Sequence, residues 1–361
     1  MRITRTSLTT GLLAALTLAA CGTGGQPGTD PTTAEPTGAG TQAPESPSES
    51  DTLTVLSHSS FSLPDELKAE FEKETGYTVT YSAPGDAGQL VNQLVLTKDS
   101  PLGDVVYGVD NTFASRANDA GVLAPYESTA AQTDDALAAD NLTPIDLGDV
   151  CINADKTWFA EKNLAIPQTL DDLTKPEYKD LLVVASPASS SPGLSFLIAT
   201  IGAKGADGWV DYWTALKDNG VLVVSGWTEA YYTEFSGADG EGPRPLVLSY
   251  STSPAFTVTD DGESTTEALL DTCFRQVEYA GVITGAQNEV GARKFIDFLL
   301  SPKVQASIPE NMYMYPAVEG TELPEEWQKF APLSTNPIEV SQDDIGANRD
   351  DWIKEWTAAV S

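Results

Sequence analysis

The chain has 361 residues, and its 53 acidic residues against 20 Lys and Arg give a formal net charge of −33 at pH 7. This excess argues against nucleic acid or an anionic membrane surface as a partner, because both repel an acidic protein. It permits a cationic ligand, although acidic surfaces mostly serve solubility. Histidine occurs only as His58, which excludes sites made of several histidines and leaves a serine triad a single candidate base.

The N-terminus has the features of an export signal. Arg2 and Arg5 precede an apolar stretch, residues 11–20, that is too short to span a membrane. Small residues then lead into Cys21, as in the lipobox of bacterial lipoproteins, although a secreted protein with an incidental Cys21 is the alternative. We therefore expect a lipoprotein signal peptide at residues 1–20, with lipidation of Cys21 on the extracellular face of the cytoplasmic membrane.

The rest of the chain divides by composition into a stalk and a folded part. Residues 21–51 are rich in Gly, Pro, Ser, Thr and Glu and contain no Leu, Ile, Val or aromatic residue, which predicts a disordered stalk. The lipid would then be the only contact with the membrane. Residues 52–361 are more than one hydrophobic core usually organises, so we expect two lobes.

Two cysteines remain if Cys21 is lipidated. An exported protein with one such pair, Cys151 and Cys273, favours a disulfide. The bond would close a long loop and stabilise the fold by up to ~4–5 kcal/mol in the chain-entropy model. Two separate buried thiols are the alternative, because spacing along a sequence does not show that two Cβ atoms meet.

Apolar runs in the first part of the folded region alternate with amphipathic helices. Strands are expected at 53–55, 77–81 and 105–109, and helices after Pro64, Gly88 and Asn111. Gly76 and Gly121 are expected to end the first and third of these helices. Strand alternating with helix predicts right-handed βαβ units and a mainly parallel sheet.

The same pattern resumes after a Pro- and Asp-rich stretch near residue 143. Strands are expected at 181–184, 221–224 and 246–248, an extended run at 278–283, and helices at 194–201 and 292–300. Polar or aromatic clusters follow several of these strands, and ligands of open α/β sheets bind at that edge. Two exported α/β lobes suggest a transport receptor that closes on a solute.

Three aromatic residues are candidates for the walls of a ligand cleft. Trp227, Tyr250 and Tyr313 each lie in or beside a loop, where ring faces could hold a cationic or heteroaromatic ligand by stacking and cation–π attraction. Core packing is the alternative for Trp227 and Tyr250, and capping of the late helix is the alternative for Tyr313. Tyr232 and Tyr315 are expected to pack rather than to face a ligand.

Three polar residues are candidates for the same cleft. Ser190 precedes a helix whose free N–H groups could attract an anion, or it simply caps that helix. Asp86 could accept a hydrogen bond from an amine, or cap the helix near Gly88. His58 ends the first strand and could stack on a ligand or adjust affinity with pH, although a lone histidine is usually uninvolved.

The chain also resembles the thiamine-binding proteins of bacterial ABC transporters. The resemblance runs in order along the chain and is carried by Ser59-Ser60-Phe61, Gly85-Asp86, Asp104-Val105-Val106, Gly108-Val109-Asp110-Asn111, Ser190-Ser191-Pro192-Gly193-Leu194, Gly226-Trp227-Thr228-Glu229-Ala230-Tyr231, Leu248-Ser249-Tyr250-Ser251-Thr252-Ser253-Pro254-Ala255, Met314-Tyr315-Pro316, and Arg349, Trp352, Ile353, Glu355 and Trp356 in the tail. It implies a two-lobe periplasmic-binding-protein type II fold, with residues 52–146 and 278–361 in lobe 1 and 147–277 in lobe 2. The ligand would lie in the cleft between the lobes and pass to an ABC permease and ATPase.

The resemblance also implies which residues touch thiamine or its phosphates. The family's contacts fall on His58, Asp86, Ser190, Trp227, Tyr250, Phe256 and Tyr313, and Tyr231 beside Trp227 is added to this set. The thiazolium would face Trp227 and Tyr250, the aminopyrimidine would lie near Phe256 and Tyr313 with its amine on Asp86, and the Ser190 loop would meet the hydroxyethyl or phosphate end. Better-known relatives have Tyr or Trp at the positions of His58, Phe256 and Tyr313, so the preference among thiamine and its two phosphates stays open. A monomer without metal, cofactor or catalytic residues is expected.

Two other functions compete with this one. A ferric-iron receptor of the same superfamily would use adjacent phenolates, for which Tyr231 and Tyr232 are candidates. The following residues 233–235 lack the arginine associated with those receptors. A hydrolase using Asp86 and His58 is the other alternative, but the spacing shows neither a nucleophile elbow nor a pair of acid and base carboxylates.

Overall fold

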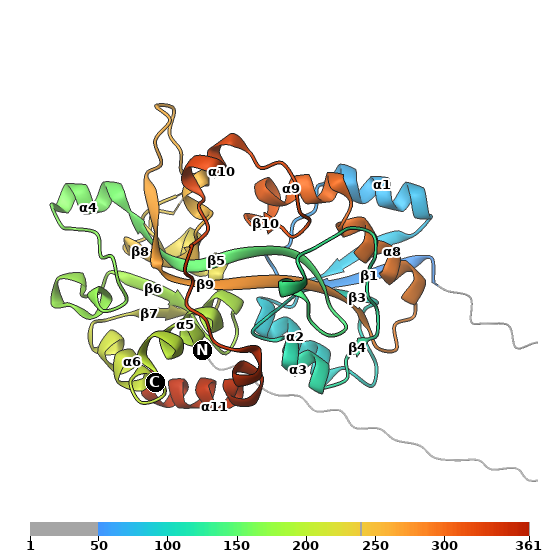
Figure 1. Cartoon of the computed structure of the whole chain (residues 1–361), viewed down its shortest axis with the longest axis horizontal. Coiled ribbons are helices and arrows are strands. Elements are labelled where there is room, and N and C mark those ends of the chain that lie inside the picture. The colour runs from blue at the N-terminus through green and yellow to red at the C-terminus, as the bar shows by residue number, and fades with distance from the viewer. Residues whose placement is uncertain (1–49, 239, 361) are drawn as a thin grey trace, which may run out of the picture. The chain divides into compact units, whose positions relative to one another are not determined.

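The computed structural model describes residues 50–360 except residue 239, and these form the second of the two units of the chain, Glu49–Ser361 (Figure 1). The expected signal peptide, Cys21 and nearly all of the expected stalk lie outside the described residues. One ten-stranded mixed sheet runs through this unit in the order β2-β1-β3-β9-β5-β8-β6-β7, with β10 paired to β5 and β4 paired to β9. In Figure 1, α2, α3, α5, α6 and α11 lie below the sheet, and α1, α9 and α10 lie above it.

The first half of the sheet is parallel, as the sequence predicts. Strand β1 (Thr52–Ser57) pairs in parallel with β2 (Thr78–Ser82) and with β3 (Val105–Asp110). Helices connect them: α1 (Asp65–Thr75), α2 (Ala87–Leu96) and, after β3, α3 (Ala114–Asp119). Helix α1 ends at Gly76, whose φ of 80° is a left-handed conformation that glycine adopts without strain.

Two long antiparallel strands form the middle of the sheet. Strand β5 (Thr143–Asp155) and strand β9 (Thr266–Ile283) pair along most of their lengths, and the disulfide between Cys151 and Cys273 joins them. The sequence predicts only residues 278–283 of β9 and treats residue 143 as an interruption, which is wrong. Both strands carry buried polar side chains at the centre of the molecule, so neither shows the apolar pattern of an ordinary buried strand.

The other half of the sheet is again parallel at its edge. Strand β6 (Leu182–Ala185) pairs in parallel with β7 (Leu222–Val224) and with β8 (Leu246–Tyr250), and β8 pairs antiparallel with β5. Helix α5 (Ser191–Lys204) is buried along nearly its whole length, and α6 (Trp209–Asp218) covers it. A three-residue helix α7 (Trp227–Glu229) continues into a π-helical turn, Ala230–Glu234.

The remaining elements complete both sides of the sheet. They are α4 (Lys156–Lys162), β4 (Leu123–Ala124), α8 (Glu289–Leu299), α9 (Pro302–Met312), β10 (Tyr315–Pro316), α10 (Glu325–Phe330), α11 (Gln342–Val360) and the short 3₁₀ turns Asp135–Leu137, Asp172–Thr174, Pro176–Tyr178 and Ser253–Phe256. Helix α11 packs on α6, where Trp356 meets Trp213 edge to face at 5.5 Å, and it also contacts α3. Nowhere in residues 50–360, residue 239 apart, does a helix combine the length and apolar character that crossing a bilayer needs.

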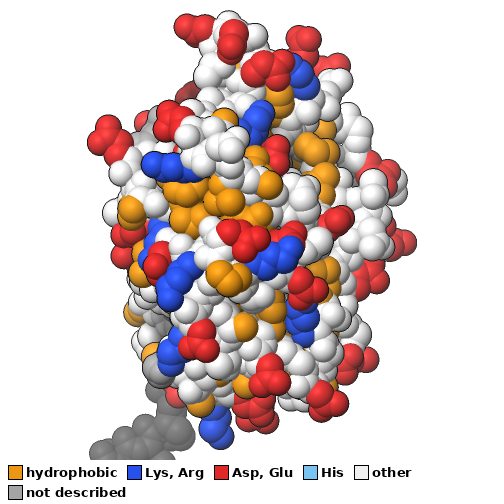
Figure 2. Space-filling model, turned by 90° about the vertical axis from the view of Figure 1, so that its left-hand side faces the viewer, with side chains coloured by type: hydrophobic (Ala, Val, Ile, Leu, Met, Phe, Trp, Pro, Cys, Tyr) orange, Lys and Arg blue, Asp and Glu red, His pale blue; other side chains and the backbone are white. Residues whose placement is uncertain are grey.

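Acidic side chains cover much of the surface. Figure 2 shows Asp and Glu spread over one whole face, interspersed with fewer Lys and Arg, and a hydrophobic patch in its upper half. Charges distributed in this way repel other copies of the chain and keep it soluble. The surface charge alone therefore does not identify a ligand, and the character of the cavity has to be judged from the residues that line it.

Candidate ligand-binding site

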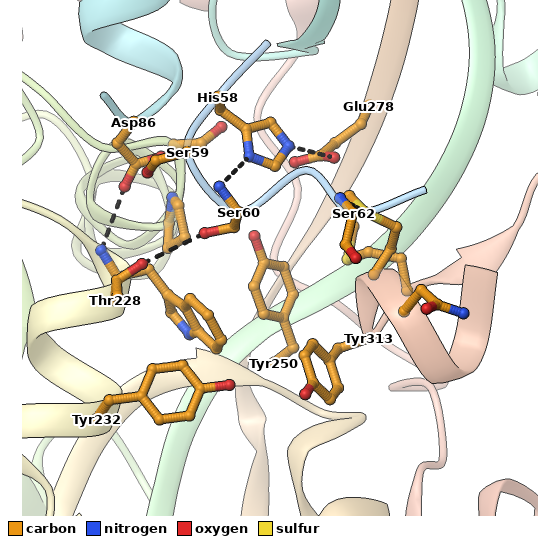
Figure 3. A pocket seen from close by; sticks show the side chains of 16 residues that line it. His58, Ser59, Ser60, Ser62, Asp86, Thr228, Tyr232, Tyr250, Glu278 and Tyr313 are labelled. Carbon is orange, nitrogen blue, oxygen red and sulfur yellow. Dashed lines mark hydrogen bonds and ion pairs between the residues drawn. The ribbon is translucent and has the colours of Figure 1, made fainter. Parts of the chain in front are cut away.

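A cavity of about 310 Å³ lies where loops from both halves of the sheet meet (Figure 3). The lining residues come from the loops after β1 and β2, from the start of α5, from α7 and the π-helical turn after it, from β8 and β9, and from the end of α9 and the two residues that follow it. They are His58, Ser59, Ser60, Ser62, Asp86, Ser191, Pro192, Trp227, Thr228, Tyr232, Tyr250, Glu278, Asn311, Met312, Tyr313 and Met314. The size suits a small organic molecule of two rings. Much of this lining follows the ends of strands, where the sequence places the candidate ligand site.

Trp227 forms the central aromatic wall. Its indole Nε1 donates a hydrogen bond of 2.9 Å to the Ser249 hydroxyl, which fixes the plane of the ring. Tyr231 stacks behind the indole, with ring centroids 5.1 Å apart and an interplanar angle of 16°. Tyr250 and Tyr313 approach within 6.3 and 6.4 Å of the indole. The indole is thus held from behind and presented to the cavity.

Tyr313 is positioned by an unusual backbone conformation. It follows the last residue of α9 with φ of 59°, a left-handed conformation that costs a non-glycine residue of order 1 kcal/mol or more. The Thr252 hydroxyl donates to the Tyr313 carbonyl at 2.5 Å, and the Phe256 ring meets the Tyr313 ring edge to face at 4.2 Å. These contacts hold the tyrosine ring between the main cavity and a second one.

The second cavity adjoins the first along the aromatic wall. It has a volume of about 240 Å³ and is lined by Trp227, Tyr231, Tyr232, Ala238, Ser253, Phe256 and Tyr313. Trp227, Tyr232 and Tyr313 line both cavities. The site therefore offers two aromatic compartments side by side.

Asp86 joins the two halves of the site. One carboxylate oxygen accepts from the Ala87 N–H at 2.8 Å and caps α2, while the other accepts from the Trp227 N–H at 3.2 Å. The Ser60 and Thr228 hydroxyls make a second contact between the same loops, 3.4 Å apart. The capping role that the sequence allows for Asp86 is confirmed, and the carboxylate also borders the cavity.

His58 and Glu278 form the polar end of the cavity. The His58 Nε2 lies 3.3 Å from a Glu278 oxygen, and its Nδ1 accepts from the Ser60 N–H at 3.1 Å. Glu278 also accepts from the Tyr107 hydroxyl at 3.2 Å and from the Gln276 amide at 2.9 Å. Figure 3 shows His58 and Glu278 facing each other on the side opposite Tyr232 and Tyr313.

A group of buried acids surrounds this pair. Burial, together with the charge of Glu278, raises the pKa of Asp146 well above its ordinary value. Burial raises the pKa of Asp110 to about 7, against hydrogen bonds from Thr112 and Phe113 that lower it. Tyr107 donates to both Asp146 and Glu278. The polar end of the cavity is therefore an acidic, proton-holding network.

Among the lining residues, no Lys or Arg balances the acidic groups. Asp86 and Glu278 are the acids, and neither Lys nor Arg lines the main cavity. Within the described part of the chain, moreover, no three His, Cys, Asp or Glu side chains are grouped so that they could hold a metal ion. Aromatic faces and carboxylates around one space suit an organic cation.

Most of the residues predicted from the sequence meet at these cavities, but not all. His58, Asp86, Trp227, Tyr250 and Tyr313 line the main cavity, and Tyr231 and Phe256 line the adjoining one. Ser190 lines neither: it is fully buried, and its hydroxyl caps α5 by accepting from the Gly193 N–H. The next residue, Ser191, borders the main cavity with a buried hydroxyl that has no hydrogen-bond partner.

Several lining residues are not among those that the sequence predicts for the site. The sequence predicts packing for Tyr232, yet this residue is 40% exposed and lines both cavities. Glu278 was placed in an extended run without a role, although an acid inside an apolar strand was a signal that could have identified it. Ser59 and Ser60 lie in the loop after the first strand, next to His58, and that position alone could have added them to the site.

Fold and site together define a two-lobe binding protein, with a cavity between the two halves of a sheet that long strands join. Residues 100–339 match the family described as bacterial extracellular solute-binding protein. The chain is also 30% identical over 321 residues to the thiamine-binding periplasmic protein of Brucella suis biovar 1 (strain 1330), covering 86% of this chain and 92% of that protein. The chain therefore belongs to this family of bacterial extracellular solute-binding proteins, and its two-lobe fold is that of the periplasmic binding proteins.

Solved structures agree with this assignment. A periplasmic thiamin binding protein superimposes with a TM-score of 0.76 and 28% identity, covering 86% of this chain and 96% of that chain. The ferric binding protein from Campylobacter jejuni superimposes with a TM-score of 0.68 at 17% identity, covering 85% and 99% of the two chains. The second likeness concerns the fold alone.

Proposed function

We propose that the protein is an extracytoplasmic receptor that binds thiamine for uptake by an ABC transporter. One observation carries the proposal: an aromatic cavity that contains Asp86 and Glu278 but neither Lys nor Arg occurs in a chain 30% identical to a protein named for binding thiamine. Thiamine combines a permanent cation with two aromatic rings, and both features have counterparts here.

The two compartments suggest how thiamine would lie. The thiazolium would face Trp227 and Tyr250, where Glu278 lies on the same cavity and offsets its charge. The aminopyrimidine would enter the adjoining compartment between Phe256 and Tyr313. The exocyclic amine would be directed at Asp86, and the hydroxyethyl end would reach the Ser191 hydroxyl, which has no partner within the described protein.

A calorimetric titration with thiamine, thiamine monophosphate and thiamine diphosphate, followed in parallel by tryptophan fluorescence, tests this proposal. We expect thiamine to bind with a dissociation constant below about 10 μM, because a scavenging receptor holds its ligand with at least ~7 kcal/mol. Quenching of the Trp227 fluorescence should follow the same isotherm. Failure of all three compounds to bind at this level would contradict the proposal.

The arrangement of the tyrosine pair favours thiamine over ferric ion. Tyr231 is 5% exposed and its ring stacks on Trp227, so that the pair serves the aromatic wall. The Tyr231 and Tyr232 rings stand edge to face at an interplanar angle of 87°. Addition of ferric ion tests this directly: a visible phenolate-to-iron charge-transfer band would favour the iron receptor instead.

The cellular setting forms part of the proposal. Cys21 would carry the lipid anchor after removal of residues 1–20, residues 21–51 would serve as the tether, and a permease and ATPase would receive the ligand from the monomeric receptor. Lobe 1 would comprise residues 52–146 and 278–361, and lobe 2 residues 147–277, with the tail helix α11 also touching α6 of lobe 2. The receptor would carry out no catalysis.

Mass spectrometry of the membrane-extracted protein tests the anchor and the disulfide together. We expect an N-terminal peptide that begins at a diacylated Cys21, and no free thiol at Cys151 or Cys273, which the structure joins. An unmodified Cys21 in a protein released into the medium would contradict the anchor. Alkylation of Cys151 and Cys273 without prior reduction would contradict the disulfide.

A further inference from the structure

His58, the one histidine in the sequence, occupies a position that bears directly on the charge of the cavity. Its side chain lines the cavity although the residue is only 6% exposed. Gly108, with φ of 93°, makes room for the ring, because a Cβ atom there would fall 2.1 Å from the His58 Cδ2. The imidazole is therefore closely packed and in contact with the space that a ligand would fill.

The hydrogen bonds of His58 define its protonation state in this conformation. A backbone N–H can only donate, so the contact from Ser60 N–H requires a lone pair on Nδ1. The proton of the neutral ring is then on Nε2, where it faces the Glu278 oxygen at 3.3 Å. A second proton on Nδ1 would place two N–H groups opposite each other and break the contact with Ser60.

The charged groups around His58 favour the protonated imidazolium instead. Burial lowers the pKa of His58, but the charge and hydrogen bond of Glu278, together with Asp86 and Asp110, outweigh it and raise the pKa above the ordinary value of 6.5. Titratable groups from several elements surround the imidazole and Glu278. They are Glu278 from β9, Asp110 and Tyr107 from β3, Asp86 before α2 and Tyr250 from β8, while Asp146 from β5 acts through its hydrogen bond with Tyr107. The hydrogen bonds of His58 require a neutral ring, whereas the nearby acids favour a protonated one. A modest change in the nearby charge can therefore change the protonation state of His58.

We infer that His58 is a proton switch, which must be neutral for the cavity to hold a cationic ligand and which expels that ligand when it is protonated. The inference rests on the proposed function. An imidazolium would repel a cation in the same cavity and would neutralise Glu278, the acid that favours the cation. It would also release the Ser60 N–H, whose loop contacts Thr228 across the site.

The sign of the pH dependence follows from the reciprocity of binding. A bound cation lowers the pKa of His58, so the protonated protein binds the cation less well. Affinity is therefore complete above the pKa of His58 in the free protein, which lies above 6.5, and is lost as the pH falls through that value. The affinity for the cation falls by up to about tenfold per pH unit, and this fall ends below the pKa that His58 has in the complex.

Titration of thiamine into wild type, His58→Gln and Asp110→Asn between about pH 5.5 and about pH 8.5 tests the inference, since this window brackets the usual pKa of histidine. We expect the dissociation constant of the wild type to rise steeply toward low pH and that of His58→Gln to be nearly independent of pH. Asp110→Asn is the matched control, because Asp110 titrates near pH 7 but does not line the cavity. It should keep the steep dependence. A His58→Gln protein that keeps it, or an Asp110→Asn protein that loses it, would overturn the inference.

A second measurement needs no variant. The single imidazole gives one set of NMR signals, so the pKa of His58 can be followed in wild-type protein with and without saturating thiamine. We expect thiamine to lower this pKa by about one unit or more, and the Ser60 amide signal of the free protein to shift with the same midpoint. An unchanged pKa would overturn the inference alone. Absence of thiamine binding at every pH would overturn the proposed function as well, so the two failures are distinguishable.

Discussion

The two sides of the cavity are built from different chemistry and hold their residues in different ways. On one side, Trp227, Tyr232 and Tyr313 present aromatic rings that are fixed mainly by contacts with other rings. On the other side, His58, Asp86 and Glu278 present groups fixed by hydrogen bonds. Figure 3 shows Tyr232 and Tyr313 on the side opposite His58 and Glu278. The aromatic side supplies contact area, while the polar side sets the charge of the ligand.

This difference implies different consequences when each side is altered. Ring faces attract a cation at short range and also gain from excluding water, so their loss should weaken any aromatic ligand. A carboxylate acts on net charge and is sensitive to protonation, so its loss should weaken cations in particular. Substitutions on the two sides can therefore separate shape recognition from charge recognition.

The largest effect is expected for Trp227→Ala. Removing the indole takes away the central wall of the cavity, which stacks on Tyr231. The substitution should weaken thiamine binding by about 2 kcal/mol, roughly thirtyfold. Calorimetric titration measures the change. Trp158→Ala is the control, because Trp158 also contacts a neighbouring ring, edge to face, but lines neither cavity. Equal dissociation constants for Trp227→Ala and the wild type would assign Trp227 to core packing.

A smaller effect is expected for Glu278→Gln. The substitution keeps the shape but removes a buried charge beside the cavity, and should weaken thiamine by about 1.4 kcal/mol, or tenfold. A neutral thiamine analogue with an uncharged ring in place of the thiazolium should lose much less. Glu229→Gln is the matched control, since Glu229 is an exposed acid that accepts from Ser225 outside the main cavity. Equal losses for the charged and the neutral ligand would show that Glu278 acts through shape alone.

The sequence predicts the aromatic side of the site better than the polar side. Trp227 follows the short apolar strand β7 and Tyr250 ends β8, and ligands of α/β folds generally bind at this edge of the sheet. Glu278 lies within β9, where the buried polar residues Gln276 and Glu278 interrupt the apolar pattern that predicts a buried strand. Their partners, among them Tyr107 and Asp146, are distant along the chain, so only the folded structure brings them together.

The two long strands in the middle of the sheet could not be predicted from the sequence for the same reason. A strand that is buried on both faces is expected to be apolar throughout, but β5 contains the buried residues Asp146, Asp149 and Asn153. Asp149 pairs with Arg275 from β9, and Asp146 accepts a hydrogen bond from Tyr107 of β3. The two parallel halves, by contrast, follow from local periodicity and turn residues, and the sequence predicted them strand by strand.

The smallest expected effects concern two adjacent serines, one of which stabilises a helix while the other borders the cavity. Ser190 and Ser191 cannot be distinguished in the sequence, because either could cap a helix that has Pro192 in its first turn. In the structure the Ser190 hydroxyl caps α5, whereas the Ser191 hydroxyl borders the cavity without a partner. Ser190→Ala should therefore lower the free energy of unfolding by about 1 kcal/mol and leave thiamine affinity nearly unchanged.

Ser191→Ala should give the opposite result. No hydrogen bond within the described protein is lost, so the melting temperature should stay close to that of the wild type. Thiamine affinity should fall by about 1 kcal/mol, roughly fivefold, because the hydroxyethyl end loses a hydrogen-bond partner. Thermal melts and titrations on both variants measure the two quantities side by side. If Ser190→Ala weakens binding and Ser191→Ala does not, the ligand contacts Ser190, as the family resemblance implies, and α5 must turn or shift when the ligand enters.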